Sequence, residues 1–256
     1  MGTTKLTRKE ILAEDPIHAA MIRIVDAFRS QGRTIAIVAA CALVAAGAVY
    51  FGVRYLESRA MKAQEDLGRG LSFYHGLVDP QAADDPLAKG PPARFKTEEA
   101  KYQAASQAFS KVIAEYGSSK AAVIARYYLG LCQLRLGRKD EAIRNLEEVR
   151  NNTRDRTVGY LAKKVLATIH MDSGNHKEAA AILEGMIKDP QCELPREALR
   201  LDLARVYAAS GRREDALKLV KEAREDPKAS LLSSMIVREM ERIEKAPPAS
   251  EGAKPE

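Results

Sequence analysis

A set of small and aliphatic residues recurs every 37 positions through the second half of the chain. A glycine stands at each of Gly137, Gly174 and Gly211. Four other positions repeat at the same interval: Leu129, Leu166 and Leu203; Gly130, Ala167 and Ala204; Ala142, Ala179 and Ala216; and the aliphatic Leu146, Leu183 and Val220. A period of this length predicts copies of one supersecondary unit, which must stack because one copy cannot bury its apolar face alone.

Each unit reads as two helices joined by a short turn. The glycine is placed to end the first helix, where a left-handed residue without a Cβ is favoured. Polar residues such as Arg138–Glu141 then open the second helix. The small residue of the first helix lies twelve positions before the alanine of the second, so the two backbones can approach closely. We predict full repeats at about 119–150, 156–187 and 195–226.

Further helices flank these repeats within a domain that we place at 54–245. Ala105, Phe109 and Val112 precede Ala142, Leu146 and Val149 by the same interval, which predicts an isolated second helix. Residues 79–95 are rich in Pro, Gly and Asp and predict a loop, so the missing first helix should lie in 56–78. Residues 229–245 predict a capping helix, and the polar tail 246–256 should be disordered.

The composition supports an all-α fold. Only 5% of residues are aromatic and there is no Trp, while Ala, Leu, Glu, Lys and Arg dominate. These side chains lose little conformational entropy in a helix. No stretch shows the sustained apolar and polar alternation of a strand.

Residues 34–53 carry no charge and predict a transmembrane helix. Twenty residues at about 1.5 Å each span roughly 30 Å, the thickness of the hydrocarbon core. Arg33 and Arg54 bound the segment, and Tyr50, Phe51 and Tyr55 stand where an interfacial belt would lie. A lipid bilayer is therefore one expected partner, and the fold class is a single transmembrane helix followed by a helical-hairpin solenoid.

Two alternatives to an uncleaved anchor exist. The segment could be a buried helix of a soluble domain, although no other segment supplies a comparable apolar partner. It could also be a cleavable signal peptide, with Ser58-Arg59-Ala60 as the cleavage site. The preceding 33 residues and the length of the apolar run argue against a signal peptide.

The segment 1–33 predicts a short amphipathic helix before the anchor. Asp15 and Pro16 are typical of a helix start, and the apolar stripe consists of Ile17, Met21, Ile24 and Phe28. Basic residues are nearly balanced on the two sides of the anchor, so charge does not decide its orientation. Small-residue pairs such as Ala42/Ala46 could support a homo-oligomer through the transmembrane helix.

Charge and cysteine content exclude some classes of function. The net charge of +6 is spread along helices that also carry carboxylates, whereas a nucleic-acid binder concentrates its basic residues. We therefore expect no nucleic-acid partner. Cys41, Cys132 and Cys192 form no paired framework, and a bridge between Cys132 and Cys192 stays open.

No motif of catalysis or cofactor binding is present. His170 and His176 lie six residues apart without a cysteine or carboxylate at metal-ligand spacing. There is no phosphate-binding loop of the G-x-x-x-x-G-K-[ST] type and no G-x-S-x-G elbow. We expect no catalytic, cofactor-binding or metal site, and no enzyme activity.

Function is then expected in a groove lined by the first helix of each repeat. Counting from the small position, the predicted protein-binding groove comprises Tyr127, Leu131, Leu134, Arg135, Lys164, Thr168, Met171, Asp172, Leu201, Arg205 and Ala208. Its mixture of apolar and basic side chains suits an extended or helical protein segment.

The repeats resemble the tetratricopeptide repeat. That motif has Leu-Gly in the first helix and Ala twelve residues after the Gly, which Leu129-Gly130 and Ala142 match. The later units replace the Gly by Ala, and the period is 37 in place of the family's usual 34. Some members hold a C-terminal carboxylate with a Lys/Asn/Arg clamp. Lys164 matches one position of that clamp, while Thr168 stands where the clamp has Asn.

The layout of anchor plus repeats resembles the bacterial ancillary SecYEG translocon subunit family. The residues that carry this resemblance include Ala105-x-x-x-Phe109, Leu129-Gly130 and Glu141-Ala142-Ile143. It implies a protein of the bacterial inner membrane with a cytoplasmic N-terminus and periplasmic repeats. It also implies partners among translocon subunits or envelope chaperones. The rival hypothesis is a scaffold for another envelope assembly, such as cell division or outer-membrane biogenesis.

Overall fold

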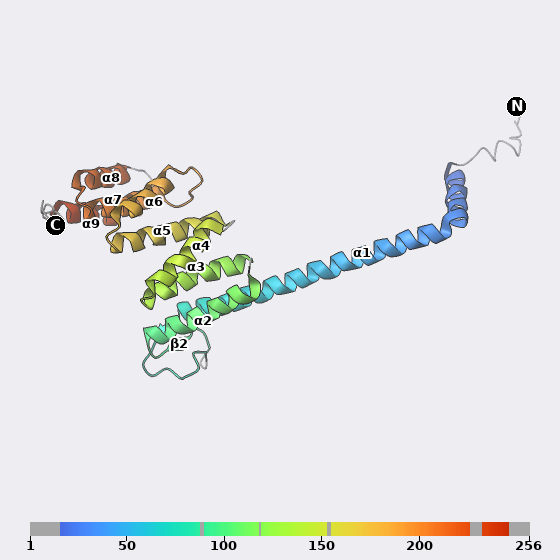
Figure 1. The fold of residues 1–256 in the computed structure, drawn as a ribbon, viewed down its shortest axis with the longest axis horizontal. Coiled ribbons are helices and arrows are strands. Elements are labelled where there is room, and N and C mark those ends of the chain that lie inside the picture. Colours follow the sequence, from blue (N-terminus) through green and yellow to red (C-terminus); the bar gives the residue numbers. More distant parts are fainter. Residues whose placement is uncertain (1–15, 88–89, 118, 153–154, 226–231, 246–256) are drawn as a thin grey trace, which may run out of the picture. The chain divides into compact units, whose positions relative to one another are not determined.

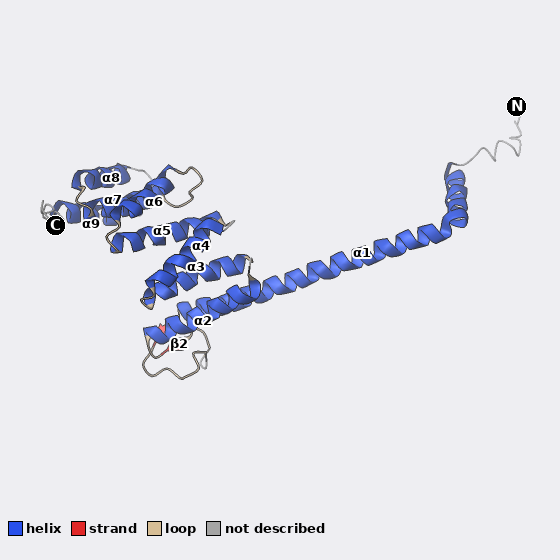
Figure 2. Ribbon diagram, in the orientation of Figure 1, coloured by secondary structure: helices blue, strands red, loops and turns tan. Residues whose placement is uncertain are grey.

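The computed structural model describes residues 16–87, 90–117, 119–152, 155–225 and 232–245, which are predominantly helical (Figures 1 and 2). The chain divides into two compact units, Met1–Arg59 and Ala60–Glu256. Helix α1 (Pro16–Tyr74) contributes residues to both. The predicted cap Asp15 and tail 246–256 lie outside the described residues, as do the side chains of Ile17, Ile24 and Phe28.

In the first unit, α1 contains the predicted apolar stretch. Among the described residues it is the one helix long and apolar enough to cross a membrane, with a mean hydropathy of 2.3 over its most apolar window. None of that window is buried, and Leu43, Val44 and Phe51 are each more than 70% exposed. This exposure speaks against the alternative of a buried helix in a soluble core.

The second unit consists of helices that pack on their neighbours in chain order. After the end of α1 these are α2 (Glu98–Tyr116), α3 (Lys120–Arg135), α4 (Lys139–Asn152), α5 (Arg156–Asp172), α6 (His176–Lys188), α7 (Arg196–Ala209), α8 (Arg213–Glu225) and α9 (Ser233–Lys245). Figure 1 shows them stacked pair by pair. The prediction of a helical-hairpin solenoid is thereby confirmed.

The ends of these helices follow from local chemistry. Thr97, Ser119 and Asp155 each precede a helix, and their side-chain oxygens accept a hydrogen bond from the backbone N–H three residues on. At the other end, Gly137, Gly174 and Gly211 have φ values of 74°, 77° and 82°.

The three glycine turns share one hydrogen-bond pattern. After α3, the N–H of Gly137 donates to the carbonyl of Leu134 at 3.1 Å, and the N–H of Arg138 donates to that of Gln133 at 2.8 Å. Equivalent pairs follow α5 and α7. This is the Schellman pattern, which satisfies helix-end carbonyls and requires a left-handed residue. The predicted role of the glycines is confirmed.

The repeated small residues form the seam between the paired helices. Ala142, Ala179 and Ala216 are completely buried. A Cβ added to Gly130 would lie 2.9 Å from Cγ of Leu146, so α3 and α4 approach too closely for a larger residue. The remaining repeated aliphatic positions are all less than 10% exposed, which places the core along this seam.

The end of α1 packs against α2 as the first helix of a pair. Ala63 and Leu67 are buried, and a Cβ on Gly70 would lie 2.5 Å from the ring of Phe109. The hydroxyl of Tyr116 donates a hydrogen bond to Asp66 at 3.0 Å. The structure therefore supplies the predicted missing helix, as a continuation of the apolar helix.

The predicted loop 79–95 ends in a strand, because residues 94–95 pair with residues 77–78 in a short parallel strand pair that the sequence did not indicate. Strands β1 (Leu77–Val78) and β2 (Arg94–Phe95) pair in parallel. Phe95 is buried and packs edge-on against Phe73 at 5.7 Å between ring centroids. Strands of two residues have no detectable periodicity, so they could not be predicted from the sequence pattern.

The three cysteines form no disulfide in the structure. Cys132 and Cys192 are buried in separate hydrophobic clusters and form no bridge, and Cys41 is exposed. Burial raises the pKa of the Cys132 thiol to about 11. Cys132 therefore behaves as a small core residue.

Candidate functional site

Two adjoining hollows lie on the face formed by α5, α7 and α9, and together we call them the α5–α9 groove. The larger has a volume of about 380 Å³ and is lined by Met171, Asp172, Arg205, Ala208, Ala209, Arg242 and Ile243. The smaller, of about 100 Å³, is lined by Lys164, Ala167, Thr168, Met171, Leu183, Asp202, Arg205 and Val206. Met171 and Arg205 belong to both, so the two hollows are continuous.

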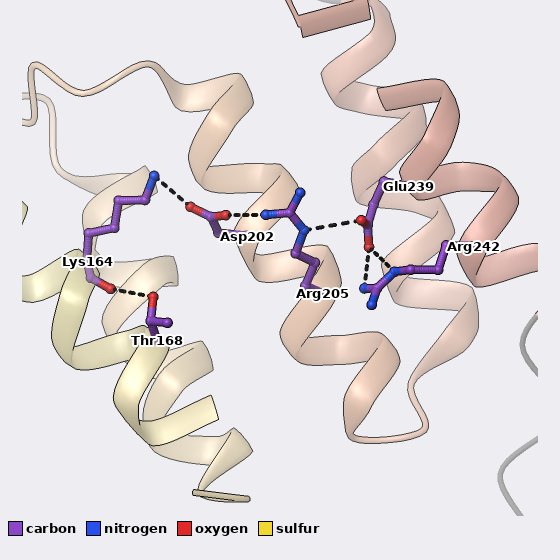
Figure 3. A network of polar contacts seen from close by, with 6 residues as sticks. All are labelled: Lys164, Thr168, Asp202, Arg205, Glu239 and Arg242. Carbon is purple, nitrogen blue, oxygen red and sulfur yellow. Dashed lines mark hydrogen bonds and ion pairs between the residues drawn. The ribbon is translucent and has the colours of Figure 1, made fainter. Parts of the chain in front are cut away.

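A chain of ion pairs crosses the groove from α5 to α9 (Figure 3). Lys164 Nζ lies 3.0 Å from Asp202 Oδ2, and Arg205 Nη1 lies 3.0 Å from Asp202 Oδ1. Arg205 Nε then donates to Glu239 Oε2 at 3.1 Å. Arg242 donates to Glu239 Oε1 from Nη2 at 2.5 Å and from Nε at 3.1 Å. Cations and carboxylates thus alternate along a line that joins three helices.

The two kinds of charge differ in their exposure. The side chains of Asp202 and Glu239 are 22% and 6% exposed, whereas those of Lys164, Arg205 and Arg242 are 40%, 33% and 61% exposed. Each carboxylate therefore lies beneath the cations that it binds. A molecule approaching the groove therefore meets these ammonium and guanidinium groups before Asp202 or Glu239.

The ion-pair chain repeats with the same 37-residue interval as the core. Asp202 and Arg205 are three residues apart on α7, and Glu239 and Arg242 occupy the equivalent positions on α9. Residues three apart lie on one face of a helix, so each arginine reaches the carboxylate of its own helix. Asp202 also binds Lys164 of α5, and Glu239 also binds Arg205 of α7.

The floor of the groove is apolar. Ile243 is 2% exposed, Ala167 is 1% exposed, and Met171 and Ala208 pack partly buried against the same cluster. Thr168 is exposed, and its hydroxyl donates to the carbonyl of Lys164 at 3.2 Å, within its own helix. The site can therefore receive apolar side chains on its floor and anionic groups along its cationic row.

The structure brings together most of the residues predicted from the second and third repeats. Lys164, Thr168, Met171, Asp172, Arg205 and Ala208 all line the α5–α9 groove. Leu201 does not, because it is only 2% exposed and belongs to the core behind α7. Its assignment to the groove was wrong, since the helix turns this position toward the seam.

The residues predicted from the first repeat lie on α3, away from the α5–α9 groove. Tyr127 and Leu134 pack against the cluster around Leu146, and burial raises the pKa of Tyr127 to about 12. Leu131 is half-buried, and Arg135 is exposed with its guanidinium 6.0 Å from the ring centroid of Tyr102. Tyr127 and Leu134 therefore serve packing more than binding.

Sequence reasoning missed Asp202, Glu239 and Arg242. The available signal was the 37-residue interval itself, which relates Asp202 to Glu239 and Arg205 to Arg242. The repeat was not recognised in α9 because Glu241 stands where the earlier repeats have a small residue. Within the described residues, no group of three His, Cys, Asp or Glu side chains is placed to hold a metal ion.

Comparison with known proteins identifies the type of the repeats. Sequence models of the tetratricopeptide repeat match residues 98–153 and residues 170–234. A search of curated proteins finds no match. Two crystal structures of nearly identical TPR-like repeats, from a candidate kinesin light chain of Podosopora anserina, are similar to this chain. One of them, a single-substitution variant, is 18% identical, with a TM-score of 0.41, over 74% of this chain and 93% of its own. The other is 16% identical, with the same TM-score, over 74% and 95%. The chain thus contains tetratricopeptide repeats, at residues 98–153 and 170–234.

Proposed function

We propose that this chain is a membrane-anchored scaffold, without enzymatic activity, that holds another protein in the α5–α9 groove. The observation that carries the proposal is the groove itself, in which an apolar floor lies beside a row of cations, with Arg242 exposed and Lys164 and Arg205 partly buried. Tetratricopeptide repeats generally bind other proteins. A groove between helices that offers both apolar and charged contacts suits an extended or helical protein segment.

The apolar part of α1 supports the membrane anchor within this proposal. Its length and hydropathy suit a single crossing by residues 34–53, with the repeat domain on one side. The resemblance of the layout to the ancillary SecYEG translocon subunit family leads us to place the chain in the bacterial inner membrane. The N-terminus is then cytoplasmic and the repeats are periplasmic, beside the Sec translocon or the periplasmic chaperones.

The groove is tested by co-purification of the full chain from cells in mild detergent. Thr168→Trp places a bulky, uncharged side chain at an exposed position of the groove and should abolish recovery of the partner. Ala181→Trp introduces the same side chain at an exposed position of α6 and should leave recovery unchanged. Equal recovery with both variants would contradict the assignment of the groove.

The identity of the recovered proteins tests the cellular role. Translocon subunits or envelope chaperones, identified by mass spectrometry, are the expected result. Recovery of cell-division or outer-membrane assembly proteins instead would favour the rival envelope scaffold.

The anchor is tested separately. Deletion of residues 34–53 should move the chain from the carbonate-resistant membrane fraction into the aqueous fraction. A C-terminal alkaline phosphatase fusion, which is active only in the periplasm, should be active. An active β-galactosidase fusion would instead place the repeats in the cytoplasm.

A further inference from the structure

The ion-pair chain of the α5–α9 groove separates its two signs of charge by depth. Asp202 and Glu239 are the more covered groups, while Lys164 and Arg205 are partly buried and Arg242 is exposed. An ammonium group carries three N–H donors and a guanidinium five, more than the two carboxylates can accept here. The cations are therefore fixed in place and retain donors for a ligand.

From this arrangement we infer that the partner segment held by the groove is acidic. Its internal Asp or Glu side chains bind the row formed by Lys164, Arg205 and Arg242, and its apolar side chains rest on the floor at Met171, Ala208 and Ile243. This inference rests on the proposed function, because it names the chemistry of the protein that the same groove holds.

Charge complementarity favours an acidic ligand over a basic one. A lysine or arginine entering the groove would meet the exposed Arg242 and the partly buried Lys164 and Arg205 before either covered carboxylate. Asp172 is the exposed carboxylate of the lining, and it lies in the larger hollow only. Charge-assisted hydrogen bonds from guanidinium to carboxylate are also stronger than neutral ones, and they can be bidentate.

The covered carboxylates act as positioning residues. Glu239 receives both Arg205 and Arg242, and Asp202 receives both Lys164 and Arg205. Long cationic side chains lose rotamer entropy when they bind a ligand, and this cost is smaller when they are already held. The buried acids thus prepare the cationic row for a carboxylate ligand.

The experiment measures peptide binding to the full chain in detergent by fluorescence anisotropy. The probe is a pool of labelled peptides of about twelve residues, randomised over Ala, Leu and Glu, with both termini blocked. Matched pools carry Gln or Lys in place of Glu, and a fourth pool leaves the C-terminal carboxylate of the Gln peptides free. We expect the Glu pool to bind at least about tenfold more tightly than the Gln pool, which corresponds to about 1.4 kcal/mol. Affinity should fall as salt increases from about 50 to 300 mM.

Matched variants locate the binding in the groove. Lys164→Gln with Arg242→Gln removes two cations of the row and should weaken binding of the Glu pool about tenfold. Lys188→Gln with Lys245→Gln removes the same net charge from side chains 79% and 78% exposed outside the groove lining, and should have little effect. Unfolding temperatures of both double variants are measured to confirm that each is folded.

Four outcomes would overturn the inference. These are equal binding of the Glu and Gln pools, tighter binding of the Lys pool, a preference that depends only on a free C-terminal carboxylate, and equal weakening by the two double variants. If no acidic preference is found while Thr168→Trp still abolishes partner recovery, the acidic partner is wrong and the proposed function stands. If Thr168→Trp has no effect either, both fall.

Discussion

At the scale of single residues, the seam between α3 and α4 depends on the absence of one methyl group at Gly130. Gly130 has no room for a Cβ because Leu146 fills the space, whereas Gly137 has open space but a backbone of positive φ. Gly185 on α6 has neither restriction. Substitutions at these three glycines therefore test three effects on stability separately: crowding, backbone strain and helix propensity.

We predict different effects of alanine at these positions. Gly130→Ala should destabilise the chain by about 1–3 kcal/mol through overpacking against Leu146. Gly137→Ala should cost about 1–2 kcal/mol through left-handed strain. Gly185→Ala should stabilise α6 by about 0.5–1 kcal/mol, because alanine is the better helix former. Urea unfolding of the full chain in detergent, followed by circular dichroism, measures all three. Loss of stability in Gly185→Ala would contradict this account.

The hydrogen bond from Tyr160 to Asp189, at 2.5 Å, should make stability depend on pH. This bond is the main cause that lowers the pKa of Asp189, with a second contribution from the N–H of Gln191. The same bond, with burial, raises the pKa of Tyr160 to about 12.

The direction in which stability changes with pH follows from the linkage between proton binding and folding. Asp189 contributes stability above its unfolded pKa of about 3.9, and this is lost as pH falls through its lower folded value. Tyr160 contributes stability below its unfolded pKa of about 10, lost as pH rises toward 12. Tyr160→Phe should therefore flatten the dependence of the urea midpoint on pH below about pH 4 and above about pH 10. If the dependence of the urea midpoint on pH below about pH 4 is unchanged in Tyr160→Phe, the hydrogen bond does not lower the pKa of Asp189.

At the scale of elements, α9 is held to α7 through Glu239. Its carboxylate is nearly buried and accepts from Arg205 and Arg242, so its removal leaves both guanidinium groups without that partner. Ile236 and Ile243 supply the apolar contacts of the same face. The packing of α9 thus depends on the buried carboxylate of Glu239 and on Ile236 and Ile243, which lie on either side of it.

We predict that Glu239→Gln loosens α9 more than any other helix. The expected loss is about 1–3 kcal/mol, the range for a buried acceptor that loses its charged partners. Hydrogen exchange should become faster for the amides of α9 and stay nearly unchanged in α3. Glu241→Gln on the exposed side of α9 is the control and should have a much smaller effect. Equal protection of α9 in both variants would contradict the role of Glu239.

The sequence predicted some elements well and others poorly, for physical reasons. The glycine turns and the alanine seam were predictable because each is a local requirement of backbone conformation or volume. The strand pair at Leu77 and Phe95 was not, because tertiary packing creates it. The burial of Leu201 was missed because helix rotation relative to its neighbour follows from packing on both sides. Glu239 was missed since its partner Arg205 lies 34 residues away, beyond any local pattern.

At the scale of the whole repeat domain, each helix packs mainly on the helices next to it in sequence. Stability in such an arrangement is approximately a sum of units and of their interfaces. Leu166 lies in the middle, 1% exposed, in the cluster that joins α4 to α5. Ile236 is equally buried but lies in the last helix.

We predict that Leu166→Ala separates the unfolding of the two halves of the domain. The substitution should cost about 2–5 kcal/mol at the central interface, so the urea transition should broaden or resolve into two steps. Ile236→Ala should cost a similar amount but affect α9 first, with the main transition still single. Circular dichroism and hydrogen exchange, measured on both variants, distinguish these results. A single sharp transition for Leu166→Ala would show stronger coupling than neighbour contacts provide.

The shared interval of the glycine turns and of the ion-pair chain has a consequence for how such a groove changes over generations. Because Asp202/Arg205 and Glu239/Arg242 sit at equivalent places in successive units, an in-frame duplication of 37 residues that includes Asp202 and Arg205 would copy a carboxylate and its arginine in register. The new arginine would meet the next carboxylate without any further substitution. The groove can thus be lengthened by recombination in whole steps, whereas point mutations alone would have to create both charges together.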